Sequence, residues 1–201
     1  MTQFFDSLTR MTPMELFAQA LGIIAMALLI FSFQFKKNVG HFIMQALGCG
    51  LFCVHYLLLG LGGEATNWSG FMMDALSATR ALILLGGERT NKLPFLIAQL
   101  AAAAAALTVT ILVFREVWWL ALFPFAAQTA NLLGTWTRHP RKMRWVQLGV
   151  VSPCWLAYNI LITPMSIGGI ICETFNMVSV VVYFIRMRFE KKRASGAETV
   201  C

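Results

Sequence analysis

The chain has 201 residues, of which 58% are apolar and 12% are charged, and its formal net charge is +7. This composition excludes an ordinary soluble domain, in which about a quarter of the residues are charged. The basic residues cluster at the ends of apolar segments, which argues against nucleic-acid binding and indicates a protein embedded in a lipid bilayer.

Seven apolar stretches are each long enough to cross a membrane, because a spanning helix needs about 20 residues. We therefore predict an all-α, polytopic membrane protein. The segment 1–14 would precede the first helix on the outer side of the membrane, and 189–201 would form a basic cytoplasmic tail. The predicted helices are 15–35, 41–60, 64–86, 93–114, 117–137, 145–163 and 165–187.

An internal repeat divides these helices into groups. When the chain is shifted by 102 residues, each apolar segment of the first half aligns with one of the second half, and the fourth segment has no counterpart. This pattern predicts a first three-helix bundle at 15–86, a linker with the fourth helix at 87–114, and a second bundle at 115–188. The aligned pairs include Gln45 and Gln147, Tyr56 and Tyr158, Leu59 and Leu161, and Asp74 and Asn176.

The distribution of Lys and Arg predicts the orientation. If the N-terminus is outside, 13 basic residues fall on the inner side, Arg10 and Arg115 fall on the outer side, and Arg80 lies within a span. Positive charge gathers on the cytoplasmic side of membrane proteins. We therefore predict that the N-terminus is outside and the C-terminus is cytoplasmic.

Short motifs resemble those of the PQ-loop superfamily and of the SWEET sugar transporters within it. Ser32-Phe33-Gln34-Phe35-Lys36-Lys37 resembles the Ser-Phe-x-Pro-Gln signature without its proline, and Trp155-Leu156-Ala157-Tyr158 resembles the Trp-x-x-Tyr element of each SWEET repeat. The resemblance implies a three-one-three arrangement of helices, with two parallel triple-helix bundles and one linking helix. In SWEETs an asparagine on the third helix of each repeat lines the central pocket, and Asp74 and Asn176 match these positions.

A closer resemblance is to the YgjV-like family of bacterial inner-membrane proteins. Ser32-Phe33-Gln34, Gln45 and His55-Tyr56-Leu57-Leu58-Leu59-Gly60 carry this resemblance, which spans nearly the whole chain. It implies a multi-pass protein of the bacterial inner membrane, and it implies a fold more than a reaction.

The third and seventh predicted helices carry polar residues deep in apolar sequence. Asp74 lies near the middle of one and Asn176 at the middle of the other. A carboxylate at this depth costs about 2.5–3.5 kcal/mol on insertion scales, so it must face protein or water. Helical spacing predicts two polar stripes that line one cavity for a small polar solute, although the same residues could simply bond neighbouring helices. The candidate solute-binding residues are Asp74, Asn176, Asn67, Glu173, Trp155 and Ser77.

A buried carboxylate also suits proton coupling or a cationic ligand. Four further residues are candidates for gating or coupling. His55 is either a switch or a satisfied structural group, and Arg80 is either a snorkelling anchor or a contact for an anionic solute. Pro124 and Pro153 should kink their helices, and such kinks act as hinges in some carriers and are merely tolerated in other membrane helices.

The sequence contains no catalytic motif and no His or Cys spacing typical of a metal site, so we expect no enzyme, cofactor or metal. The favoured function is an inner-membrane transporter that moves a sugar, nucleoside or vitamin-like solute by alternating access around a midplane site. The Pnu-type vitamin transporters, with a related layout, motivate the vitamin and nucleoside classes. The alternative is a non-transporting receptor or assembly factor that uses the same cavity, as the KDEL-type cargo receptors do.

Overall fold

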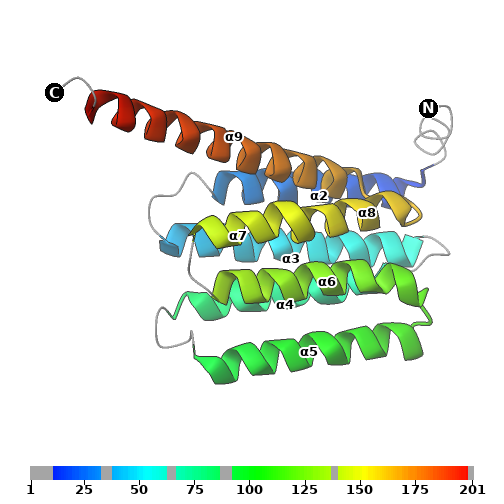
Figure 1. The fold of residues 1–201 in the computed structure, drawn as a ribbon. Coiled ribbons are helices and arrows are strands. Elements are labelled where there is room, and N and C mark those ends of the chain that lie inside the picture. Colours follow the sequence, from blue (N-terminus) through cyan, green and yellow to red (C-terminus); the bar gives the residue numbers. More distant parts are fainter. Residues whose placement is uncertain (1–10, 33–37, 63–66, 87–91, 137–139, 199–201) are drawn as a thin grey trace.

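A computed structural model describes residues 11–32, 38–62, 67–86, 92–136 and 140–198 (Figure 1). The described residues form helices and contain no strand, which confirms the prediction of an all-α chain. Several predicted features lie outside the described residues. They are residues 1–10 of the N-terminal segment, 33–37 of the Ser32 motif, the loops at 63–66 and 87–91, residues 137–139, and 199–201 of the basic tail.

The described residues build seven helical rods. Six are single helices, and the seventh is continuous from Pro140 to Leu161 but changes its helix type along the way. The single helices are α2 (Pro13–Ser32), α3 (Asn38–Gly62), α4 (Trp68–Leu84), α5 (Leu93–Leu112), α6 (Trp118–Trp136) and α9 (Ile167–Glu198). The seventh rod consists of α7 (Pro140–Val146), the π-helical turn η2 (Gln147–Val151) and α8 (Ser152–Leu161).

Local sequence signals explain where two helices begin. At the start of α2, the Thr12 N–H donates to the Glu15 carboxylate at 2.6 Å and the Glu15 N–H donates to Thr12 Oγ1 at 3.3 Å. This reciprocal pair is a capping box, which satisfies backbone donors that a helix start leaves open. Pro94 occupies the first turn of α5, where its missing N–H has no helical partner to lose.

The two prolines predicted to kink their helices have different surroundings. Pro153 lacks the N–H that would bond the carbonyl of Gly149, and the π-helical turn ends just before it. The Ser152 N–H bonds the Gln147 carbonyl, five residues back, as a π-helix requires. The distortion predicted at Pro153 therefore takes the form of a wide turn. By contrast, α6 continues through the buried Pro124.

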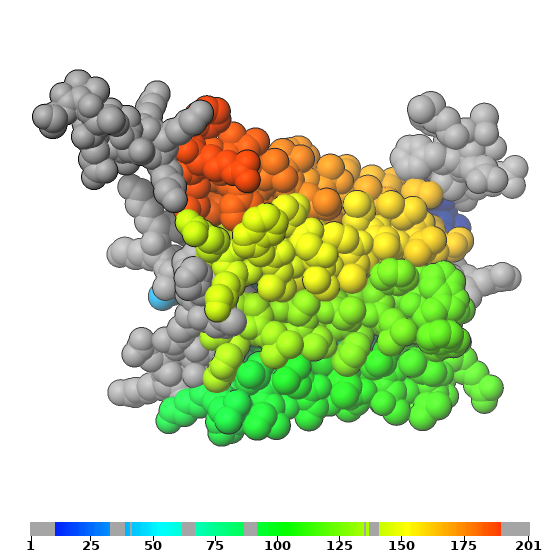
Figure 2. All heavy atoms as spheres, viewed as in Figure 1, coloured from blue at the N-terminus to red at the C-terminus, as the bar shows by residue number. Residues whose placement is uncertain are grey.

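The helices pack as two rows of three. One row is α2-α3-α4 and the other is α9-α8-α6, with α2 beside α9 and α4 beside α6 (Figure 1). Helix α5 packs against α4 and α6, so it covers one edge of the two rows. On the face shown in Figure 2, α9, the α7–α8 rod, α6 and α5 follow one another as parallel bands. The inner helices, α3 and α8, stand opposite each other.

This arrangement follows the internal repeat. The 102-residue shift relates α2 to α6, α3 to the α7–α8 rod, and α4 to α9. The shift therefore exchanges the two edge contacts, because α2 beside α9 becomes α6 beside α4. The SWEET-like arrangement of two triple-helix bundles stays a prediction.

Four helices of the described part of the chain are long and apolar enough to cross a membrane. They are Pro13–Ser32, Phe42–Leu61, Leu93–Leu112 and Ile167–Phe189. Helix α4 has 17 residues, a length of about 26 Å, which is slightly short of a bilayer core of about 30 Å. For α4, α6 and the α7–α8 rod, a membrane-spanning role stays a prediction, and so does the orientation of the termini.

Large apolar side chains are exposed on the outward faces of the helices. Examples are Phe31, Leu82, Leu112, Trp118 and Phe189, each more than half exposed. In water such a surface would aggregate, whereas in a membrane the lipid chains cover it. The exposed apolar surface therefore agrees with a protein embedded in lipid.

Helices α2 and α9 approach each other closely at two glycines. A Cβ placed on Gly168 would lie 2.5 Å from the carbonyl carbon of Gly22, which belongs to the backbone of α2. A rigid backbone cannot move aside as a flexible side chain can. The contact between the rows at this edge therefore requires glycine at position 168.

We expect Gly168→Ala to lower the thermal unfolding midpoint of the detergent-solubilised protein by several degrees. The added methyl group must push α9 away from α2, and overpacking of this kind costs about 1–3 kcal/mol. Gly50→Ala is the matched control, because nothing lies within 4 Å of a Cβ placed at Gly50. Equal midpoints for Gly168→Ala and the wild type would show that the helices are not in this close contact.

Candidate functional site

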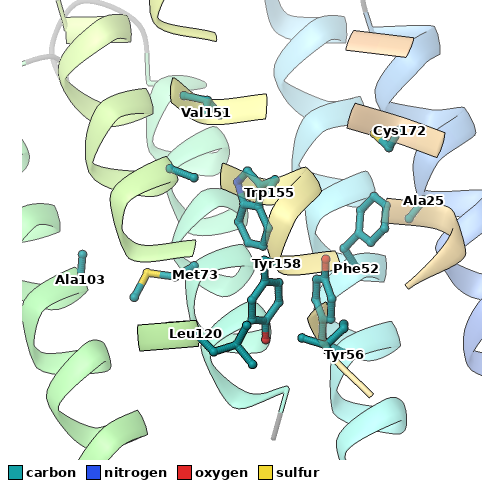
Figure 3. Close-up of a cluster of buried hydrophobic side chains, with 12 residues drawn as sticks. Ala25, Phe52, Tyr56, Met73, Ala103, Leu120, Val151, Trp155, Tyr158 and Cys172 are labelled. Carbon is teal, nitrogen blue, oxygen red and sulfur yellow. The ribbon is translucent and has the colours of Figure 1, made fainter. Parts of the chain in front are cut away.

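Aromatic side chains meet between α3 and α8 at the centre of the bundle. Tyr56 of α3 lies against Trp155 and Tyr158 of α8, and Phe52 of α3 stacks on Tyr56 (Figure 3). The ring of Tyr56 stacks on Trp155 with centroids 6.2 Å apart, and it meets Tyr158 edge-on at 5.9 Å. We call these four residues the aromatic cluster. Trp155, predicted to line a solute path, is thus packed in the core against both repeat-related tyrosines.

Each tyrosine hydroxyl bonds to the opposite row of helices. The Tyr56 hydroxyl donates to Asn159 Oδ1 on α8 at 2.5 Å. The Tyr158 hydroxyl accepts from the Gly70 N–H at 3.0 Å and lies 3.0 Å from Ser69 Oγ, both in the first turn of α4. We call this end of the bundle, where α3 and α8 finish and α4 and α9 begin, the tyrosine end.

A buried carboxyl group completes the contact at the start of α4. Glu116 lies in the loop between α5 and α6, is 3% exposed, and accepts from the Ser69 N–H at 2.8 Å and from Ser69 Oγ at 2.6 Å. The preceding Arg115 has a φ of 56°, in the left-handed region, where the chain turns between α5 and α6. Burial raises the pKa of Glu116 to about 7, although the hydrogen bonds from Ser69 oppose this effect.

His55 joins three helices at the same end. Its Nδ1 lies 2.6 Å from the Ala18 carbonyl of α2, and its Nε2 lies 2.7 Å from Ser166 Oγ, just before α9. Because a carbonyl only accepts, Nδ1 carries the proton in the neutral ring, and Nε2 accepts from Ser166. Ser166 Oγ in turn accepts from the Gly169 N–H at 3.1 Å. The ring is fully buried, as expected of a structural group, and its gating role stays a prediction.

Gln19 of α2 also bonds the start of α9. Its Nε2 donates to the Met165 carbonyl at 2.7 Å and its Oε1 accepts from the Ile167 N–H at 3.0 Å. The buried polar groups at this end therefore connect the two rows from edge to centre. We call them the tyrosine-end network, which comprises Gln19, His55, Tyr56, Ser69, Glu116, Tyr158, Asn159 and Ser166.

Two acidic residues lie deeper in the bundle. Asp74 of α4 is 9% exposed, and Glu173 lies on α9, the helix that the repeat relates to α4. Glu173 accepts a hydrogen bond from Asn176 Nδ2 at 3.4 Å, one turn further along the helix. The structure thus joins two of the predicted site residues, Glu173 and Asn176, by a hydrogen bond within α9. We call Asp74 and Glu173 the acidic pair.

Asp74 has no hydrogen bond or ion pair to any residue in the described part of the chain. A second unpartnered polar group is Asn67, which is 1% exposed and whose amide nitrogen and oxygen both lack a hydrogen-bond partner. Such groups are rare in folded proteins, because burial without a partner costs about 1–3 kcal/mol. Both belong to the predicted site.

Other predicted residues lie apart from the acidic pair. Ser77 donates to Gln128 Oε1 of α6 at 2.8 Å, so it faces the neighbouring helix at the edge of the rows. Arg80 borders a small cavity between α4, α5 and α6, together with Gln99 and Trp136. Ser77 and Arg80 thus contact the α5 and α6 side of α4, and a polar cavity lined by Asn67, Asp74 and Ser77 stays a prediction.

Sequence reasoning missed most of the tyrosine-end network. Glu116 follows Arg115 in a short loop, and a loop carboxylate is ordinarily solvated. Asn159 directly follows Tyr158 in the sequence, and no sequence pattern pairs it with Tyr56. The available signal was the repeat itself, which placed Tyr56 and Tyr158 at equivalent positions. Among the described residues, no group of three or more His, Cys, Asp or Glu is arranged to hold a metal.

Long apolar helices, a lipid-compatible surface and a network of buried, hydrogen-bonded polar groups define a polytopic helical membrane protein. The chain matches the Imp-YgjV family, described as bacterial inner membrane protein, over residues 16–191, and it belongs to this family. Searches of curated proteins and of solved structures found no match. The predicted membership in the YgjV-like family is confirmed, and the placement within the PQ-loop and SWEET superfamily stays a prediction.

The buried Glu116 predicts a pH dependence of stability. Its pKa rises from 4.5 to about 7 on folding, so the folded state holds the proton more tightly. The free energy of unfolding should therefore fall by about 3 kcal/mol as the pH rises from 4.5 to about 7. We expect the thermal unfolding midpoint of the wild type, measured in detergent from about pH 5 to 8, to decrease relative to that of Glu116→Gln.

Glu15→Gln serves as the control, because Glu15 is an acidic residue in the capping box of α2, outside the tyrosine-end network. The difference between the midpoints of the wild type and this variant should stay constant over the same pH range. A constant difference for Glu116→Gln as well would contradict the raised pKa of Glu116.

Proposed function

We propose that this inner-membrane protein is a carrier, not an enzyme, and that it moves a small polar solute by alternating access between its two helix rows. The observation that supports this most strongly is the acidic pair. Asp74 is buried and has no hydrogen bond to another described residue, and Glu173 lies on α9, the helix that the repeat relates to α4. A carboxyl group in the interior of a membrane protein is expensive and marks a functional site by default.

The tyrosine-end network supports a carrier in a second way. In the proposed mechanism this network closes one end of the space between the rows, because its hydrogen bonds run from one row to the other. Access from that end requires these bonds to break while the rows rock apart. With the N-terminus outside, the tyrosine end faces the periplasm, and the acidic pair is reached from the cytoplasm in this state.

The grouping of the helices into two repeat-related rows also fits a SWEET-like three-one-three carrier. Helix α5 would be the linker that restores the chain direction before the second bundle begins. In this arrangement Asp74 and Asn176 occupy equivalent positions on α4 and α9. Sugars, nucleosides and vitamin-like compounds are the solute classes that this architecture suggests.

The test is uptake by the purified protein reconstituted into lipid vesicles. Solutes are first screened by their effect on the thermal unfolding midpoint, since a ligand at 100 times its dissociation constant adds about 2.7 kcal/mol to the folded state. The screen covers sugars, nucleosides, vitamins, amino acids and short peptides. We expect a stabilising solute to accumulate in the vesicles with saturable kinetics.

Asp74→Asn should keep the fold, because the amide has the same shape as the carboxyl group and carries no charge to bury. Its unfolding midpoint should stay within a few degrees of the wild type, while uptake falls by at least about tenfold. Full uptake by this variant would place the site elsewhere. A solute that binds and never enters the vesicles would indicate a non-transporting receptor.

A further inference from the structure

We propose that a cleft between α4, α5 and α6 binds the phosphate group of an anionic phospholipid. The cleft is lined by Arg80 of α4, Gln99 of α5 and Trp136 of α6, together with apolar side chains, and we call it the Arg80 cleft. This inference does not depend on the proposed transport function, because its ligand is a component of the membrane.

The Arg80 cleft lies where three packed helices reach one end of the bundle. Helices α4, α5 and α6 each contact the other two (Figure 1). Arg80 stands four residues before the end of α4, a distance of about 6 Å along the axis, and Trp136 is the last residue of α6. Helix α5 begins here, and this end lies opposite the tyrosine end, where α4 starts. The cleft therefore lies near the depth of the phosphate groups of a bilayer.

The polar side chains of the cleft supply hydrogen-bond donors and positive charge. The Arg80 guanidinium has five N–H groups and no acceptor, so it can bond an anion while it also contacts its neighbours. The Trp136 indole N–H is likewise a donor only. None of the residues that line the cleft is acidic. The ligand that matches these groups accepts hydrogen bonds and carries negative charge, as a phosphate does.

Gln99 gives a second, independent indication of a ligand. Its Nε2 is buried and has no hydrogen-bond partner among the described residues, although an unmade bond of this kind is costly. The other polar side chains of α5, Thr108 and Thr110, bond carbonyls of their own helix. One amide of an otherwise apolar helix is thus left with an unused donor, and it lines the same cleft as Arg80.

The size of the cleft favours a lipid over a larger soluble anion. Its volume of about 20 Å³ holds one water-sized group, so a phosphate would insert one oxygen and keep the rest of its molecule outside. A sugar phosphate or nucleotide would find no pocket for its remaining atoms. A phospholipid needs none, because its acyl chains lie along the apolar surface of the protein.

The apolar surface around the cleft suits those chains. Phe95, which lines the cleft, is 42% exposed, and Leu82, Leu93 and Ile97 on the same two helices are each more than half exposed. Helix α5 covers one edge of the two rows, so this surface faces lipid. With the N-terminus outside, this end is cytoplasmic, where basic pockets between helices bind anionic head groups.

The experiment measures the thermal unfolding midpoint of the full-length protein in a neutral detergent as dioleoylphosphatidylglycerol is added. Dioleoylphosphatidylcholine has the same chains and no net charge, whereas inorganic phosphate and glycerol 1-phosphate have the charge and no chains. We expect the anionic lipid alone to raise the midpoint in a saturable manner. Arg80→Gln and Gln99→Leu should each weaken its apparent affinity at least about tenfold, because each removes a hydrogen bond to a charged group.

Two variants separate binding from folding. Without lipid, Gln99→Leu should unfold no earlier than the wild type, since it removes an amide nitrogen that has no partner. Arg141→Gln, which removes an exposed basic residue at the start of α7, should change the affinity for the anionic lipid less than about twofold.

Three results would overturn the inference. Equal stabilisation by phosphatidylcholine, or full affinity in Gln99→Leu, would show that the anionic lipid does not bind through this cleft. Equal stabilisation by inorganic phosphate or glycerol 1-phosphate would assign the cleft to a free anion. No stabilisation by the anionic lipid would leave the cleft to water. None of these results bears on uptake of a solute into vesicles, so the carrier proposal is tested separately.

Discussion

Two tyrosines, one from each repeat, meet at the centre of the bundle, and each hydroxyl reaches the opposite row. A buried hydroxyl without a partner costs about 1–3 kcal/mol, so the partners of Tyr56 and Tyr158 fix how the rows face each other. Asn159 holds Tyr56, and the start of α4 holds Tyr158. The remaining polar groups of this end, such as His55, extend the same constraint to α2 and α9.

The contacts at this end combine tight packing with hydrogen bonding. A Cβ on Gly70 would lie 2.9 Å from the Tyr158 ring, so the tyrosine reaches the N–H of this residue only because no side chain intervenes. A Cβ on Gly169 would lie 2.5 Å from the Asn159 side chain, which must stay in place to accept from Tyr56. Gly70 at the start of α4 thus allows Tyr158 of the opposite row to reach the backbone, and Gly169 at the start of α9 leaves room for Asn159 of the neighbouring α8.

Much of the fold was predictable from the sequence, because apolar length and an internal repeat are local or periodic signals. Apolar length predicts the helical rods, and the internal repeat predicts their grouping and the equivalence of Tyr56 and Tyr158. Asp74 was predictable as a site residue from the cost of a carboxyl group in apolar sequence. The bond between Tyr56 and Asn159 joins residues 103 positions apart, and that between Ser69 and Glu116 joins residues 47 apart. No periodicity encodes such pairings, since they depend on which helix faces meet in three dimensions.

The π-helical turn before Pro153 makes the two repeats mechanically unequal. Its counterpart, α3, is an uninterrupted α-helix from Asn38 to Gly62, whereas the α7–α8 rod holds one residue more in the turn at Gln147–Val151. The π-helical turn contains one residue more than an α-helical turn. Because each residue of an α-helix corresponds to a rotation of about 100°, the extra residue changes the relative rotation of the two parts of the rod. Trp155 and Tyr158 lie beyond the turn, so its extra residue sets the direction in which their rings face, whereas Tyr56 stands on an uninterrupted α-helix. The two repeat-related tyrosines are therefore oriented by different backbone geometries.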